Sequence, residues 1–262
     1  MSIDLSMARH SWVAYKTLAA KEIRRFARLW LQTVLPSAIT MSLYFVIFGK
    51  LVGKRIGDME GHNYMEFIVP GLIMMAVITN SYSNVVSSFF GAKFQRHVEE
   101  MLVSPMPNWC ILCGFITGGT ARGLTVAVVV TIVSLAFTSL EIHNTLITAS
   151  VVVLTAVLFS LGGFINAIFA RRFDDIAIVP TFVLTPLTYL GGVFYSISML
   201  SPFWQGVSRT NPILYMVNAF RYGILGYSDI DLKVAFGVII GFIAALYCLA
   251  LYLLHRGVGV RS

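Results

Sequence analysis

The sequence predicts an all-α, polytopic membrane protein that crosses the bilayer six times. Of its 262 residues, 57% are hydrophobic and only 12% are charged, and the mean hydropathy is +0.80. A soluble domain carries roughly 25% charged residues, so this chain has about half of the charge that covers a globular surface. The third observation is that the apolar residues gather in long runs, as membrane-crossing helices require.

Six of these runs are long enough to cross roughly 30 Å of hydrocarbon, which takes roughly 20 helical residues. They cover 31–52, 67–91, 118–139, 145–170, 176–195 and 232–254. A further apolar stretch, 211–227, is too short to cross and contains Arg221. We predict that it forms a re-entrant or interfacial helix within an external segment, 196–230, capped by Asn211 with Pro212 at its first helical position.

Residues 1–30 predict an amphipathic helix at the membrane surface, followed by the six-helix transmembrane domain over 31–262. Trp12, Tyr15, Ala19, Ile23, Phe26 and Trp30 recur every three or four residues, and lysines and arginines occupy the other faces. This pattern is typical of a helix that lies in the headgroup plane of the membrane. Membrane lipid is therefore one expected partner of the chain.

The distribution of lysine and arginine favours cytoplasmic N- and C-termini, because cytoplasmic loops carry an excess of these residues. With this orientation the cytoplasmic side holds Arg9, Lys16, Lys21, Arg24, Arg25, Arg28, Lys93, Arg96, Arg171, Arg172, Arg256 and Arg261. The external side holds half as many, namely Lys50, Lys54, Arg55, Arg209, Arg221 and Lys233. We expect a multi-pass protein of the plasma (inner) membrane.

The sequence contains no recognisable catalytic machinery. It has no phosphate-binding loop, no H-E-x-x-H motif and no nucleophile–base set, so we expect no catalytic residues and no cofactor of its own. Its 12 acidic residues all fall in loops or at the ends of spans, whereas gradient-driven carriers usually place an ionisable group near mid-membrane. Cys110 and Cys113 form a C-x-x-C, but the histidines are scattered, so we predict packing and no metal site.

One charged segment, AKFQRHVEEMLVSPMPN (92–108), interrupts the apolar pattern. Its apolar side chains fall on one stripe and its charged side chains cover the rest of a helix that ends before Pro105. Such a helix, expected over 92–105, fits a groove on another protein, although a plain interfacial loop remains the alternative. The candidate contact residues are Phe94, Arg96, Glu99, Glu100, Met101 and Leu102.

Polar side chains within the apolar runs are candidates for a substrate path. Asn80, Asn84 and Ser87 lie on one face of the second span, and Arg122 lies near the start of the third. Hydrogen bonds between helices, or snorkelling of Arg122 to the interface, are the alternatives.

On the external side, Tyr215 and Arg221 are candidates for a gate. A local ion pair of Arg221 with Asp229 or Asp231 is the alternative, because an arginine in an apolar segment is costly unless it is paired or wet.

The chain resembles the ABC-2-type exporter permeases, and within them the YadH-like and nodulation-exporter-like branch. The signature pattern of that family is matched by Leu184, Leu187, Leu190, Gly191, Val193, Leu200, Ser201, Pro212, Ile213, Tyr215 and Arg221. The order of spans and loops agrees over essentially the whole chain. This resemblance implies the transmembrane subunit of an ABC exporter, a homodimer that forms the translocation path and carries two copies of a separate ABC ATPase.

The same resemblance implies that 92–105 is the coupling helix, that 11–29 is a connecting helix packed on the ATPase, and that ATP and Mg are bound by the ATPase. No nucleic-acid partner is expected. The alternative function is a stand-alone channel or a secondary carrier of small solutes or lipids, and a membrane-embedded enzyme is a third. The channel or carrier leaves the charged segment 92–108 without a role, and the enzyme lacks a catalytic constellation. Relatives on this scaffold move drugs, lipids, lipid-linked oligosaccharides and polysaccharides, so no substrate is predicted.

Overall fold

The computed structural model describes the backbone of residues 2–259, and the side chains of the same range apart from 2–8, 50 and 54. The described chain is an elongated bundle of helices, as the composition predicts. Its strands form one short antiparallel hairpin, β1 (Asp58–Met59) with β2 (His62–Asn63).

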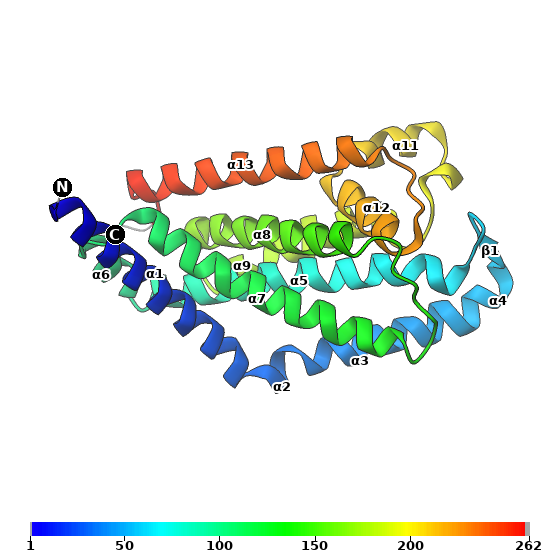
Figure 1. Ribbon diagram of the computed structural model, residues 1–262, viewed down its shortest axis with the longest axis horizontal. Helices are drawn as coiled ribbons and strands as arrows, with labels where there is room; N and C mark the ends of the chain where they lie inside the picture. The colour runs from blue at the N-terminus through cyan, green and yellow to red at the C-terminus, as the bar shows by residue number, and fades with distance from the viewer. Residues whose placement is uncertain (1, 260–262) are drawn as a thin grey trace.

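The two ends of the bundle carry different elements (Figure 1). One end, which we call the terminal end, holds the start of α1 (Ser2–Arg28), α6 (His97–Val103) and the last turns of α13 (Leu232–Arg256). The opposite end holds the hairpin, α4 (Gly53–Ile56) and α11 (Pro202–Arg209). The charged segment 92–108 and the basic N-terminal helix therefore lie at the same end.

Five helical runs in the described chain are long and apolar enough to cross a membrane by length and composition. They are Trp30–Gly49, α5 (Tyr64–Phe94), α7 (Asn108–Ser134), α8 (Thr145–Phe169) and α13. The first of them is built from α2 (Trp30–Thr33), α3 (Leu35–Tyr44) and the π-helix η1 (Phe45–Val52). Four of the runs agree with the predicted spans to within three residues at each end.

The third predicted span, 118–139, is wrong at both ends, because α7 begins at Asn108 and its helix ends at Ser134. Pro107 has extended backbone at the N-cap and starts the helix there. Residues 108–117, which lie outside the predicted span, thus form the first turns of α7.

The fifth predicted span, 176–195, corresponds to a shorter apolar helix over Asp175–Leu190. It consists of α9 (Asp175–Val179), the π-helix η2 (Pro180–Leu184) and α10 (Thr185–Leu190). The helix stops at Leu190 because Gly192 adopts a left-handed conformation, with φ of 71°, and turns the chain. Shorter helices follow: η3 (Ile197–Met199), α11 and α12 (Pro212–Leu225).

α5 is the centre of the bundle. Of the most apolar stretch of this helix, 83% is buried, against 17% for the runs Trp30–Gly49 and α13. α5 packs mainly on α8 and α7, and α12 packs on α8, α13 and α5. The outer helices are thus left with apolar surface that suits lipid.

Candidate functional site

The charged segment 92–108 is divided between two helices. α5 continues through Phe94, and the chain then turns at Gln95 and Arg96, where Arg96 has a left-handed φ of 63°. α6 covers only His97–Val103, so the prediction of one helix over 92–105 is wrong in its extent. Phe94 and Val98 are four residues apart on either side of the turn. This spacing fits one continuous helix, so the sequence pattern does not reveal the turn.

The apolar stripe of this segment faces the bundle for most of its length. Val98 is 1% exposed, and Met101 and Leu102 pack partly buried against the core. The side chains turned outward are Phe94, which is 64% exposed, and Val103, which is 89% exposed. The candidate contact residues Arg96 and Glu100 are also exposed, whereas Glu99 is half-buried.

A hollow of about 720 Å³ lies beside this segment at the terminal end. Its lining includes Lys93, Phe94, Arg96, Glu99, Phe169, Arg171 and Val258. The ring of Phe173, from the loop after α8, stands edge-on to the Phe94 ring with 5.1 Å between their centroids. Exposed aromatic rings with a basic rim form a surface suited to a protein partner, and we call it the docking surface.

Lys93 fastens this surface to the rest of the bundle. Its Nζ donates hydrogen bonds to the carbonyl oxygens of Ile168, at 2.6 Å, and Ala170, at 2.7 Å. These carbonyls end α8, where the helix leaves its last C=O groups without partners and favours a cation. The last turn of α5 and the last turn of α8 are therefore held together.

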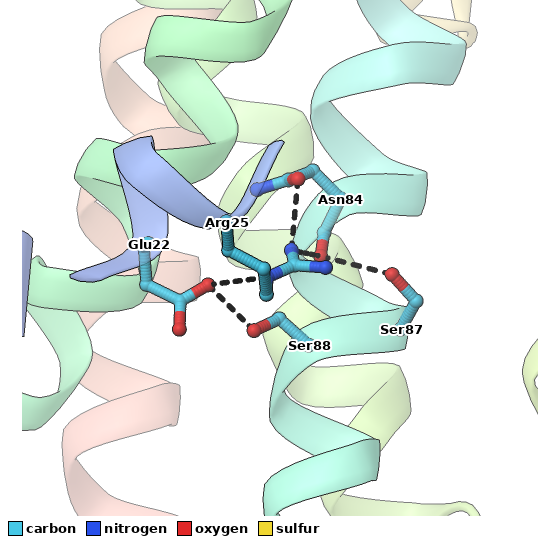
Figure 2. Close-up of polar contacts among 5 residues, drawn as sticks. All are labelled: Glu22, Arg25, Asn84, Ser87 and Ser88. Carbon is cyan, nitrogen blue, oxygen red and sulfur yellow. Dashed lines mark hydrogen bonds and ion pairs between the residues drawn. The ribbon is translucent and has the colours of Figure 1, made fainter. Parts of the chain in front are cut away.

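α1 is tied to α5 by a buried polar cluster, which we call the polar joint (Figure 2). Glu22 is 1% exposed, and its Oε2 accepts from Ser88 Oγ at 2.5 Å and from Arg25 Nε at 3.1 Å. Arg25 Nη2 donates to both the carbonyl oxygen and the side-chain oxygen of Asn84, at 3.1 and 2.9 Å. Ser87 Oγ donates to the same carbonyl.

Glu22 can be buried because α1 lies directly on α7. A Cβ atom at Gly118 would be 2.5 Å from Cβ of Glu22, so only glycine allows this approach. Leu18 and Phe26, one turn to either side of Glu22, are buried as well. Removing a carboxylate and a guanidinium from water is costly unless they stay paired, so the pairing resists separation of α1 from α5.

Of the predicted path residues, Asn80, Asn84 and Arg122 lie between helices of the bundle, whereas Ser87 is exposed. Asn80 and Asn84 are buried. Arg122 Nη2 donates to the Asn80 side-chain oxygen at 2.9 Å, and Asn80 Nδ2 donates to Ser37 Oγ on α3. These bonds join α3, α5 and α7, which is the interhelical alternative that the sequence left open.

The open face of α5 carries Ser87, which the sequence analysis named, together with two hydroxyl groups that it missed, those of Thr79 and Ser83. Thr79, Ser83 and Ser87 follow one another at intervals of four residues and are only partly covered. Thr79 and Ser83 line a groove of about 110 Å³ against the segment α9–η2–α10, which adds Thr181 and Thr185. The interval of four is visible in the sequence. The sequence analysis nevertheless assigned the candidate path to the face that carries Asn80 and Asn84. We call Thr79, Ser83 and Ser87 the hydroxyl stripe.

Arg221 joins three segments at the opposite end. It is fully buried in α12, and its Nη2 donates to the Gly192 carbonyl at 2.6 Å. Its Nε donates to the Phe67 carbonyl at 3.4 Å, and the guanidinium lies 3.9 Å from the centroid of the Phe67 ring. Among the described side chains no carboxylate is within 4 Å of it, so the alternative of a direct ion pair is wrong.

The carboxylate of Asp229 makes other bonds nearby. Its Oδ1 accepts from Ser196 Oγ and Tyr227 Oη, both at 2.7 Å. Burial, followed by this hydrogen bond, raises the pKa of Tyr227, which keeps its hydroxyl protonated and able to donate. Tyr215, the other gate candidate, donates to the Arg209 carbonyl, and the predicted cap by Asn211 is confirmed, since its side chain accepts from Ile213 N.

The described residues contain no group of three or more His, Cys, Asp or Glu side chains that could hold a metal ion. Cys110 is buried, and its Sγ donates to the Ser11 carbonyl of α1. The site is thus one of contacts between helices and of surfaces.

Known proteins are similar in sequence to this chain over most of its length. The family model described as ABC-2 type transporter matches residues 13–225. The Inner membrane transport permease YadH of Escherichia coli (strain K12) is 60% identical over 251 residues, which cover 96% of this chain and 98% of that protein. Nodulation protein J of Neorhizobium galegae is 21% identical over 215 residues, which cover 82% of each chain, and that of Rhizobium meliloti (strain 1021) is 20% identical over 253 residues, which cover 96% and 92%.

The residues matched by the family model include 13–28 of α1, the polar joint, the docking surface up to Phe173 and the buried Arg221. Because that model matches most of the chain and a transport permease is 60% identical to it, the chain belongs to the ABC-2 type transporter family.

Proposed function

We propose that this chain is the transmembrane subunit of an ATP-driven exporter, coupled to a separate ABC ATPase through its docking surface. The observation that carries this proposal is the exposed side chain of Phe94, which lines the hollow of the docking surface beside Lys93, Arg96 and Arg171. The exposed Val103 ends the neighbouring helix α6, and the chain lacks a phosphate-binding loop. A membrane transport subunit of this family must obtain its driving force from elsewhere. We expect two copies of this chain and two ATPase subunits.

In the proposed arrangement the terminal end faces the cytoplasm. The basic residues of α1, Arg96, Arg171 and Arg172 gather there, in agreement with the excess of lysine and arginine on cytoplasmic sides. The sixth crossing is the predicted span 176–195, whose helix ends at Leu190 and whose last residues continue in non-helical chain, and 196–230 forms the external re-entrant segment. Both termini then lie in the cytoplasm of a plasma (inner) membrane protein.

ATP-driven closure of the ATPase pair would act first on Phe94 and α6. Because Phe94 is the last residue of α5, α5 would transmit this movement. The polar joint would then pass the movement from α5 to α1. A packed bundle of this kind responds by switching between discrete arrangements. Lys93 extends the same movement to the end of α8.

We propose that the hydroxyl stripe lines the substrate path and faces the second copy of the chain. The stripe is the polar part of α5 that its own bundle leaves open. Ser87 keeps the role that the sequence suggested. Asn80, Asn84 and Arg122 contribute from behind, by holding α5 to α1, α3 and α7.

Loss of the docking surface is expected to abolish copurification of the ATPase. We would replace Phe94 with alanine and Arg96 with glutamate together, and purify the chain from its native membranes in mild detergent. The ATPase, identified by mass spectrometry, should fall at least roughly tenfold relative to wild type, since loss of one buried aromatic anchor and reversal of one charge cost about 2 kcal/mol or more.

The matched control replaces Phe203 with alanine and Arg209 with glutamate. Both are exposed at the opposite end of the bundle, and Phe203 is 72% exposed. This variant should retain the ATPase in full. If wild-type dimer yields no ATPase at all, the partner hypothesis fails and a self-sufficient carrier becomes the leading function.

The path is expected to admit water-soluble reagents at Thr79 but not at Thr125. Both hydroxyls are exposed and donate to the carbonyl four residues earlier at 2.9 Å, so the two positions are locally alike. In a chain whose native cysteines are replaced, Thr79→Cys should react with a charged maleimide in intact membranes at least about ten times faster than Thr125→Cys, which faces lipid. Equal rates would contradict the assignment of the stripe.

A further inference from the structure

A second hollow lies on the outer face of α1, separate from the docking surface. Its volume is about 740 Å³, and Thr17, Ala20 and Leu29 form its uncharged part. The remaining side chains that line it are all cationic, namely Lys16, Lys21, Arg24, Arg25 and Arg28. We call it the basic hollow.

The carboxylate that could neutralise this face points away from it. Glu22 is buried on the α5 side, where it bonds to Arg25 and Ser88 in the polar joint. Lys21, Arg24 and Arg28 are exposed, and no described carboxylate lies within ion-pair distance of them. Arg24 and Arg28 are one turn apart, and like charges at this spacing destabilise a helix. The positive charge of this face is therefore not neutralised by any carboxylate in the described part of the chain.

The hollow lies where the chain enters its first membrane-crossing run. That run begins at Trp30, directly after Leu29 in the lining, and Trp30 is 58% exposed. Trp12, one turn before the lining residue Lys16, is 51% exposed, and Lys16 Nζ lies 5.0 Å from the centroid of its ring. Tryptophans are enriched where the membrane meets water, so they mark the level of the lipid headgroups.

We propose that the basic hollow binds the phosphate of an anionic membrane lipid. Guanidinium groups bind phosphate oxygens through paired hydrogen bonds, and the lysine ammonium adds a point charge. Leu29 and Ala20 offer the apolar contact that a glycerol backbone and the start of an acyl chain need. A water-soluble anion would make no use of Leu29 or of the flanking tryptophans. This site does not depend on the ATPase or on the transported substrate.

The test compares lipids retained by the full-length chain after purification from membranes that contain equal phosphatidylglycerol and phosphatidylcholine. Native mass spectrometry counts the bound lipids. Wild type should retain phosphatidylglycerol over phosphatidylcholine, and the variant Lys21→Gln/Arg24→Gln/Arg28→Gln should lose this preference by roughly tenfold or more, given the contribution of each basic residue near an anionic surface. All three side chains are exposed, so the variant should keep its thermal stability and dimer.

The matched control is Lys233→Gln/Arg55→Gln/Arg209→Gln, which removes the same three charges from exposed positions at the opposite end. It should retain the lipid preference of wild type. Equal retention by wild type and the α1 variant would overturn the proposal, as would an equal loss in the control. If the α1 variant keeps its lipid but loses a copurified protein, the hollow is a protein-docking surface and the lipid site is refuted.

Discussion

Replacement of Glu22 with alanine is expected to detach α1 from the bundle. The change leaves Arg25 with Asn84 alone and leaves Ser88 Oγ without its acceptor. Breaking a buried pair by removing one partner costs about 3–5 kcal/mol, and about 2–3 kcal/mol is more appropriate here because the Arg25 side chain is 31% exposed. The midpoint of thermal unfolding should fall by roughly 5–10 °C.

Limited proteolysis separates local detachment from general unfolding. Trypsin cleaves after Lys21, Arg24 and Arg28, and these sites should be cut faster in Glu22→Ala at temperatures where α7 and α8 are still protected. Glu22→Gln, which keeps the acceptor for Ser88 but loses the charge, should be intermediate. Glu141→Ala, at an exposed carboxylate of the loop before α8, is the control. An unchanged cleavage rate in Glu22→Ala would rule out the polar joint as the attachment of α1.

Replacement of Arg221 with methionine is expected to loosen the opposite end of the bundle. Methionine fills a similar volume but leaves the Gly192 carbonyl without its donor and removes the cation from the Phe67 ring. Each loss is worth about 1–3 kcal/mol, while removal of a desolvated charge returns part of it, so we expect a net loss of roughly 2–4 kcal/mol. A lowered unfolding midpoint of the purified dimer would measure it.

Arg209→Met is the control, since Arg209 is exposed in the last turn of α11. It should leave the midpoint within about 1 °C of wild type. An Arg221→Met variant as stable as wild type would contradict the role of Arg221 as a brace. If that stable variant also failed in transport, the gate role suggested by the sequence would become the better explanation.

Most of the bundle could be predicted because lipid imposes a simple rule. A crossing helix must bury its backbone polar groups and present apolar side chains over a set length, so runs such as 145–170 and 232–254 are visible without a structure. The rule gives no prediction for the segments that join one span to the next. The beginning of α7 at Asn108 and the turn at Arg96 depend on local backbone conformation at the membrane surface, where both polar and apolar residues are tolerated.

The polar joint was not predicted, for a related reason. Hydrophobic periodicity gave α1 an apolar stripe that includes Ile23 and was expected to lie against the membrane, and Glu22 is not part of that stripe. The structure buries Glu22 and leaves Ile23 37% exposed. A carboxylate becomes acceptable in the interior when Ser88 and Arg25 bind it and Gly118 gives it room. Such a match between residues 66 positions apart cannot be read from one helix alone.

Each of the two π-helical segments, η1 and η2, interrupts the α-helical register of the helix that carries it. In η2 the wide turn lies within the helix that forms one wall of the groove at Thr79 and Ser83, and Thr185 Oγ1 donates to the Pro180 carbonyl inside it. A wide turn holds one extra residue, and each helical residue advances the direction of its side chain by about 100°. If the wide turn moves along the chain by one turn, the side chains it passes rotate about the helix axis while both ends stay in place. Such a shift would replace threonine by aliphatic side chains in the wall of the groove through a local change of hydrogen bonds, without tilting the helix.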